Sequence, residues 1–70
     1  MAESSNISKN LTQEQLHFMH LLNQNEVDYF NIYHIEDLLN TKFKNINGLA
    51  ENLVQKNILY RLQRGYYAMQ

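Results

Sequence analysis

Hydrophobic residues in the first third of the chain recur at helical spacing. They stand three or four positions apart, at Leu16, Phe18, Met19 and Leu22. Thr12 followed by Gln15 has the form of a capping box, in which each side chain bonds the backbone amide of the other residue. The pattern predicts an amphipathic helix from about Gln13 to Gln24.

Two more helices are predicted in the middle of the chain. Residues 27–32 are rich in β-branched and aromatic types and predict a short extended segment. A helix over about 33–40 follows from the spacing of Ile35, Leu38 and Leu39. After a connection over 40–44, a third helix is expected over about 45–56. Its inward stripe is Ile46, Leu49, Ala50, Leu53 and Val54.

The hydrophobic period changes from 3.6 to 2 near the end of the chain. Asn57 stands where a left-handed residue is expected to end the third helix. Residues 58–63 then alternate between two sets, Ile58, Tyr60 and Leu62 against Leu59, Arg61 and Gln63. Arg64 and Gly65 supply a turn, because glycine adopts positive φ without steric cost. Residues 58–69 therefore predict a β-hairpin.

This order of elements predicts an α+β fold, mostly α, of the winged-helix type. Three amphipathic helices would bury their apolar stripes in one core, and the C-terminal hairpin, called the wing in such folds, would cover its open edge. We expect the domain to span residues 12–70, with residues 1–11 as a flexible N-terminal arm. Most of the five tyrosines are expected to lie in the core, at least three of them.

Composition excludes several classes of function. The 70 residues contain no cysteine, which excludes disulfides and thiolate zinc sites. No apolar run approaches the ~18 residues of a membrane span, and the polar start does not resemble a signal peptide. We therefore expect a soluble, cytoplasmic domain with no membrane contact.

No pattern in the chain indicates catalysis. There is no phosphate-binding glycine loop, no nucleophile motif and no recognised pair of catalytic carboxylates. His17, His20 and His34 are better interpreted as partly exposed residues than as metal ligands, because their spacing is not diagnostic of a metal site. We expect no enzymatic activity, no cofactor and no metal.

Charge is distributed unevenly between the two halves of the chain. The net charge is −1, but residues 1–37 sum to −5 and residues 38–70 to +4. Such asymmetry indicates an anionic partner for the second half, although thirteen charges can also divide in this way by chance.

The predicted third helix and wing carry the candidate DNA contacts. In winged helices the third helix enters the major groove, where asparagine and glutamine can bond adenine in bidentate fashion. Lysines before this helix and arginines on the wing would meet phosphates, which positions a protein without reading sequence. The candidates are Lys42, Lys44, Asn45, Asn47, Asn52, Gln55, Arg61 and Arg64. Glu51 lies on the same face and would repel phosphate unless it accepts from a cytosine amino group.

Residues 53–68, LVQKNILYRLQRGYYA, resemble the end of the winged-helix domain in AbiEi-family antitoxins and related bacterial regulators. The wider resemblance covers about residues 13–69, with Asn57 where those domains commonly have glycine. Members of such families bind operator DNA and repress their own toxin–antitoxin operon. The resemblance implies a transcriptional repressor or autoregulator from a bacterial mobile element, with Arg61, Arg64 and the outer face of the third helix as DNA contacts.

A second interpretation keeps the fold and changes the partner. The acidic first half could bind a basic protein, which would suit a small inhibitor or adaptor from a phage or plasmid. The same fold could also form a homodimer through its first helix. We therefore carry double-stranded DNA as the leading partner and a protein or a second copy as the alternative.

Overall fold

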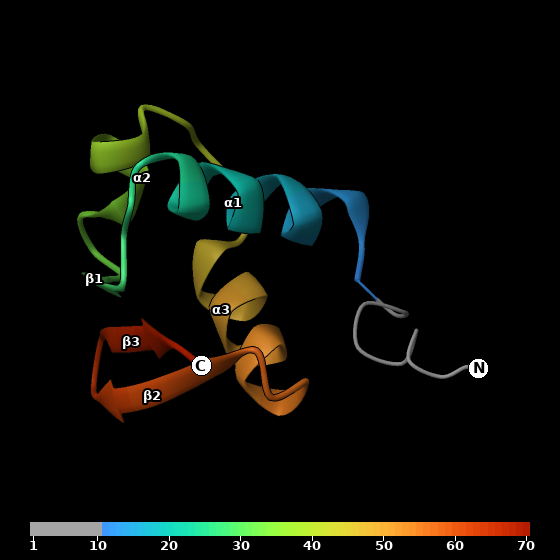
Figure 1. Cartoon of the computed structure of the whole chain (residues 1–70), viewed down its shortest axis with the longest axis vertical. Helices are drawn as coiled ribbons and strands as arrows, with labels where there is room; N and C mark the ends of the chain where they lie inside the picture. The colour runs from blue at the N-terminus through green and yellow to red at the C-terminus, as the bar shows by residue number, and fades with distance from the viewer. Residues whose placement is uncertain (1–10) are drawn as a thin grey trace.

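The computed structural model describes residues 11–70 and shows a small α+β fold (Figure 1). Its three helices are α1 (Gln13–Gln24), α2 (Ile35–Leu39) and α3 (Ile46–Gln55). Its three strands are β1 (Tyr29–Asn31), β2 (Leu59–Gln63) and β3 (Tyr66–Met69). These elements confirm the predicted order, and the arrangement is compatible with the expected winged helix. Of the N-terminal arm predicted for residues 1–11, residues 1–10 lie outside the described part, whereas Leu11 packs against the core.

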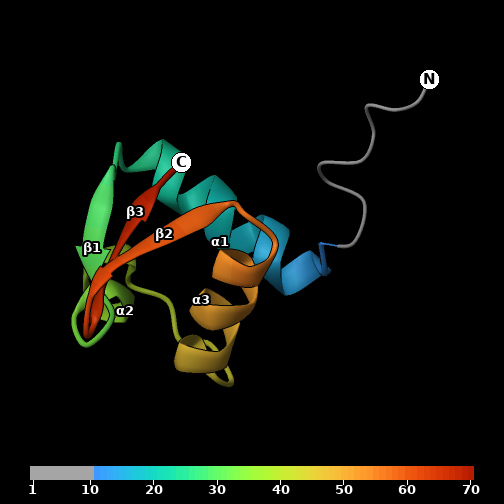
Figure 2. The ribbon, with the colours of Figure 1, turned by 90° about the horizontal axis from the view of Figure 1, so that it is seen from below.

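The three strands form one antiparallel sheet in the order β1-β3-β2. Tyr29 pairs with Ala68, and Tyr60 pairs with the same residue from the other side. An irregularity lies between Arg61 and Gln63, so that Leu62 is an extra residue opposite β3. The predicted hairpin is thus confirmed, and β1 joins it as a third strand beside β3 (Figure 2).

Local signals set the helix ends. The predicted capping box is present, since the Thr12 hydroxyl accepts from the Gln15 amide and the Gln15 side chain accepts from the Thr12 amide, both at 3.0 Å. Asn45 caps α3 in a similar way by accepting from the Gly48 amide. Asn57 has φ 63°, as predicted, and Gly65 has φ 81° in the hairpin turn. These caps satisfy amides that have no partner inside the helix.

One apolar core joins the helices to the inner face of the sheet. Phe18 and Leu22 from α1 and Leu53 from α3 are completely buried. The Phe18 ring meets Phe30 of β1 edge-on at a centroid distance of 5.6 Å. Leu59 of β2 and Tyr67 of β3 complete the sheet side of the core.

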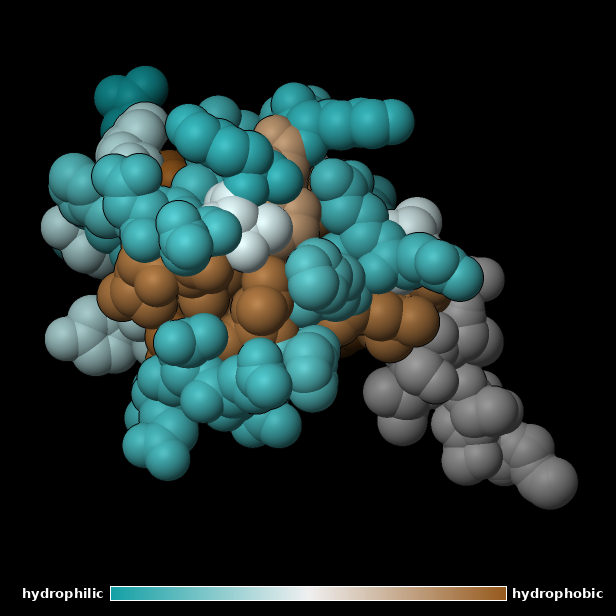
Figure 3. Space-filling view, turned by 90° about the horizontal axis from the view of Figure 1, so that it is seen from above, coloured by the Kyte–Doolittle hydropathy of each residue, from teal (hydrophilic) through white to brown (hydrophobic). Residues whose placement is uncertain are grey.

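Several residues expected inside lie at the surface. Leu16 is 49% exposed and Leu38 is 58% exposed. Figure 3 looks onto the side that carries α1 and α2, and it shows hydrophobic side chains in a band between polar ones. The prediction of at least three core tyrosines is wrong, because only Tyr67 is buried. A tyrosine can leave its ring at the surface at small cost because its hydroxyl remains hydrated.

Candidate nucleic-acid interface

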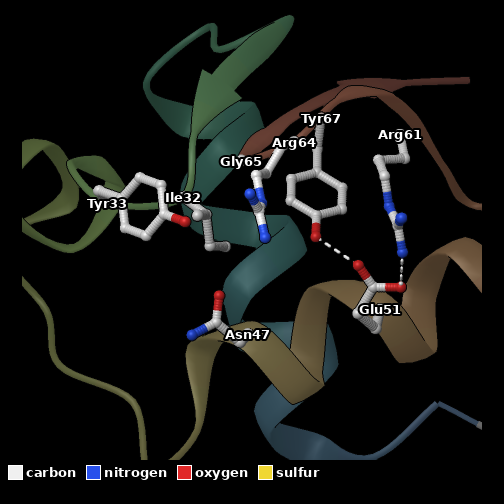
Figure 4. Close-up of a pocket in the computed structure, with 8 residues that line it drawn as sticks. All are labelled: Ile32, Tyr33, Asn47, Glu51, Arg61, Arg64, Gly65 and Tyr67. Carbon is white, nitrogen blue, oxygen red and sulfur yellow. Dashed lines mark hydrogen bonds and ion pairs between the residues drawn. The ribbon is translucent and has the colours of Figure 1, made fainter.

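A cleft of about 330 Å³ lies between α3 and the hairpin (Figure 4). Asn47 and Glu51 line it from α3, and the hairpin contributes Arg61, Arg64 and Tyr67. Gly65, with Ile32 and Tyr33 from the segment after β1, completes the wall. The cleft thus brings together three of the eight candidate DNA contacts, Asn47, Arg61 and Arg64.

Glu51 connects α3 to both strands of the hairpin. Its Oε1 accepts a hydrogen bond from Arg61 Nη2, and its Oε2 accepts one from the Tyr67 hydroxyl, each at 2.5 Å. Arg61 and Glu51 are also an ion pair. Because Arg61 is opposite Tyr67 on the neighbouring strand, both donors point from the sheet toward the same helix. The carboxylate that was expected to repel phosphate is therefore balanced by a neighbouring guanidinium.

These contacts fix the protonation states of the three groups. The hydrogen bonds from Tyr67 and from Arg61 lower the pKa of Glu51 below its ordinary value. Burial, followed by the bond to Glu51, raises the pKa of Tyr67. The pKa of Arg61 is also raised, by its bond to the same carboxylate. Near neutral pH the network therefore holds one negative charge, one positive charge and a neutral phenol.

The Glu51 network should make stability depend on acidity. Because its pKa is lowered on folding, Glu51 adds stability above about pH 4.3, its ordinary pKa, and this is lost as pH falls through the folded-state value. We expect the free energy of unfolding, measured by urea titration, to fall less between neutral and acidic pH in Glu51→Gln than in the native chain. Glu26→Gln, which removes an exposed carboxylate, is the control. Equal pH dependence in the native chain and Glu51→Gln would contradict this assignment.

Arg64 stands at the tip of the hairpin, where the turn is possible because Gly65 takes positive φ. A Cβ added at Gly65 would lie 2.8 Å from the Tyr33 ring, so the glycine also allows this close approach. The guanidinium of Arg64 points from the turn toward α3 and Asn47 (Figure 4). Within residues 11–70, Arg64 forms no ion pair, so its charge is available to an anion.

Three other candidates lie on the opposite side of α3, beside α1. Lys44, Asn45 and Asn52 line a second hollow, of about 420 Å³. Asn52 was expected to face outward, and this is wrong: its Oδ1 accepts a 2.7 Å hydrogen bond from Nε2 of the buried Gln15. Asn45 is occupied as the cap of α3. Both asparagines thus have structural bonds that base recognition would have to break.

The two remaining candidates, Lys42 and Gln55, are exposed. Lys42 lies in the connection before α3, and Gln55 is the last residue of that helix. In the part of the chain from residue 11 onward, neither Lys42 nor Lys44 makes an ion pair. Three cations make no ion pair within this described part: Lys42 and Lys44, which precede α3 in the chain, and Arg64, which lies across the cleft from α3.

Tyr33 and Tyr67 line the cleft, and neither was among the eight candidate contacts. A regular hairpin with a two-residue turn at 64–65 would place Tyr67 opposite Leu62. The irregularity between Arg61 and Gln63 places Tyr67 opposite Arg61 instead, and the sequence pattern does not indicate it. Nothing in the sequence pattern pointed to Tyr33. Among residues 11–70, no three histidine or carboxylate side chains are grouped so that they could hold a metal ion.

No family model, no curated protein and no solved structure matches this chain. The resemblance of residues 53–68 to AbiEi-family antitoxins accordingly stays a prediction. Within the same described residues, none of the helices has the length and apolar composition needed to cross a membrane.

Proposed function

We propose that this chain is a winged-helix domain that binds double-stranded DNA, with α3 in the major groove and the β2–β3 hairpin as the wing. The observation that carries the proposal is the cleft in which Arg64 of the hairpin faces Asn47 of α3. Sequence-specific DNA binding combines two kinds of contact: side chains that meet base edges and cations that bind phosphates. The cleft brings one candidate of each kind together.

The contacts divide into two kinds. Arg64, Lys42 and Lys44 would bind phosphates, since their charges are unpaired inside the described fold. Asn47 and Gln55 would meet base edges, because both amides are exposed on α3. Arg61 acts indirectly, because it neutralises Glu51 and ties the hairpin to the helix. With the resemblance at residues 53–68, these contacts support operator binding and autoregulation as the biological role.

The test is fluorescence anisotropy of labelled, mixed-sequence duplex DNA at several salt concentrations. Binding releases counterions, so log K falls with log [salt] at a slope of about −0.9 for each phosphate neutralised. Three unpaired cations predict a slope between about −2 and −3. A flat signal at about 20 mM salt would contradict the proposal, because non-specific DNA binding is strongest at low salt.

Matched variants separate the roles of the two arginines. Arg64→Gln should weaken binding to all duplexes and reduce the salt slope by about 1. The double variant Glu51→Gln/Arg61→Gln leaves the net charge unchanged and should keep the native slope, although the hairpin loses its tie to α3. A larger loss of slope in the double variant than in Arg64→Gln would show that Arg61, not Arg64, meets the phosphate.

A protein-binding module is the second candidate, and the exposed carboxylates favour it. Glu26, Asp28 and Asp37 are exposed and make no ion pair in the described region. They lie near the end of α1, the start of β1 and in α2. A flat DNA signal together with capture of a basic protein that is lost in Asp28→Asn/Asp37→Asn would support this candidate.

A further inference from the structure

The outer face of the sheet is aromatic and carries no charge. The register places Tyr29, Ala68 and Tyr60 in one row across the three strands. The next row contains Asn31 and Tyr66. These residues face away from the core, because Phe30, Leu59 and Tyr67, at alternate positions, are the buried ones.

Several large apolar side chains are exposed on or beside this face. Tyr29 is 66% exposed, Tyr60 is 53% exposed and Leu62 is 56% exposed. Leu38 of α2, beside β1, is exposed to a similar extent. Contiguous apolar patches of this kind mark sites of protein association. The lack of a cation on the face argues against nucleic acid, since single-strand binding sites combine aromatic rings with positive charge.

The face has a raised side and a hollow side. Tyr60 and Leu62 project from β2 at one edge of the sheet. At the other edge, β1 and α2 enclose a mainly apolar hollow of about 250 Å³. Tyr29, Ile35, Leu38 and Tyr66 are among its walls. The two features lie on opposite sides of the central strand β3.

We propose that this outer face is a homodimer interface. The two-fold axis of the dimer runs parallel to β3, in the plane between the two facing sheets. Such an axis exchanges the two edges of the sheet, so β2 of each copy lies over the hollow between β1 and α2 of the other. Leu62 is adjacent to the row of Gln63, Tyr66 and Asn31. The axis therefore places Leu62 of one copy at the level of the hollow beside Leu38 of the other.

Chemistry and area both fit a second copy. A two-fold interface brings a patch against itself, and an uncharged patch does so without repulsion between like charges. An ordinary interface covers about 800 Å² per partner, about one sixth of the 4890 Å² that the chain exposes. The exposed parts of Tyr29, Tyr60, Leu38 and Leu62 supply roughly 100 Å² each. Together the four side chains expose roughly 400 Å². This is close to the apolar part of one partner's surface in a typical interface, which is somewhat more than half of the buried area.

The dimer leaves the proposed DNA-binding side accessible. Glu51 and Tyr67, which line the cleft, bond to each other between α3 and the inner face of the sheet. The interface uses the outer face instead. Dimerisation and DNA binding are thus independent proposals, and either can fail without the other.

The test is analytical ultracentrifugation of the chain over a range of concentrations. The native protein should change from monomer to dimer with increasing concentration, while Leu62→Lys and Leu38→Glu should each raise the dissociation constant at least about tenfold. A mixture of the two variants should dimerise again, because the introduced lysine of one copy then meets the introduced glutamate of the other. Leu16→Lys, an exposed leucine of α1, is the control and should dimerise as the native chain does.

Circular dichroism first establishes that each variant is folded, which is expected because all three leucines are about half exposed or more. A native chain that stays monomeric to about 1 mM would overturn the proposal. So would dimers that are lost in Leu16→Lys but kept in the other two variants, since the interface would then be α1. Failure of the mixture to associate would overturn the two-fold axis along β3.

Discussion

Phe18→Ala is expected to remove most of the stability of the fold. The ring is completely buried and packs edge-on against Phe30 and against Phe43, with centroids 5.6 and 5.3 Å away. Truncating a buried phenylalanine costs about 3–5 kcal/mol, partly because a cavity remains. A chain of 70 residues has a total stability of roughly 3–10 kcal/mol, so a large fraction of the variant should be unfolded at ambient temperature.

The measurement is urea unfolding followed by circular dichroism. Tyr33→Ala is the matched control, because its ring is 69% exposed and its loss should change the free energy by less than about 0.5 kcal/mol. If Phe18→Ala were no less stable than Tyr33→Ala, Phe18 could not be the centre of the core.

Gln15→Ala is expected to cost about 2–3 kcal/mol, a large effect for a polar residue. Gln15 is 5% exposed. Its Oε1 accepts from the Thr12 amide at 3.0 Å and from Lys56 Nζ at 2.9 Å, and its Nε2 donates to Asn52. Truncation leaves the partly buried Asn52 oxygen without this donor and removes half of the capping box.

A double-mutant cycle with Asn52→Ala isolates the contact between α1 and α3. The two substitutions should be non-additive by at least about 0.5 kcal/mol in the free energy of unfolding. Gln13→Ala, at an exposed position of the same helix, supplies the control and should be additive with Asn52→Ala. Additive behaviour of Gln15→Ala would mean that the bond to Asn52 adds nothing to stability.

The helices and the hairpin were predictable because their signals are local. Thr12 and Gln15 mark the start of α1, Asn57 marks the end of α3, and Gly65 marks the turn. The alternation in β2 predicted a strand but not which set of residues faces inward. Arg61 points toward α3, on the same side of β2 as Leu59, because Glu51 of α3 pairs with its charge. Glu51 belongs to another element, so the alternation within β2 does not indicate it.

The candidate site was predictable only in part, for a related reason. Asn47 and Arg64 were named as separate candidate contacts, and the structure brings both to one cleft because α3 and the hairpin are adjacent elements. Asn52 was assigned to the outer face because helical periodicity considers one helix at a time. The hydrogen bond from Gln15 of α1 to Asn52 of α3 is a tertiary contact. The hydrophobic periodicity of a single helix cannot predict it.

The central place of β3 has a consequence for how this fold assembles. β1 follows directly after α1 in the chain, yet its pairing partner is the last strand of the fold. Neither edge strand can pair with a neighbour until β3 is present, and the pairing of β1 must close most of the described chain into a loop. Such non-local pairing slows folding relative to a simple helical bundle. The β2–β3 hairpin is local, whereas β1 can join the sheet only after β3 is present. In a nascent chain from which β3 has not yet emerged, β1 therefore has no strand to pair with, and the apolar faces of the helices lack the cover that Tyr67 of β3 supplies.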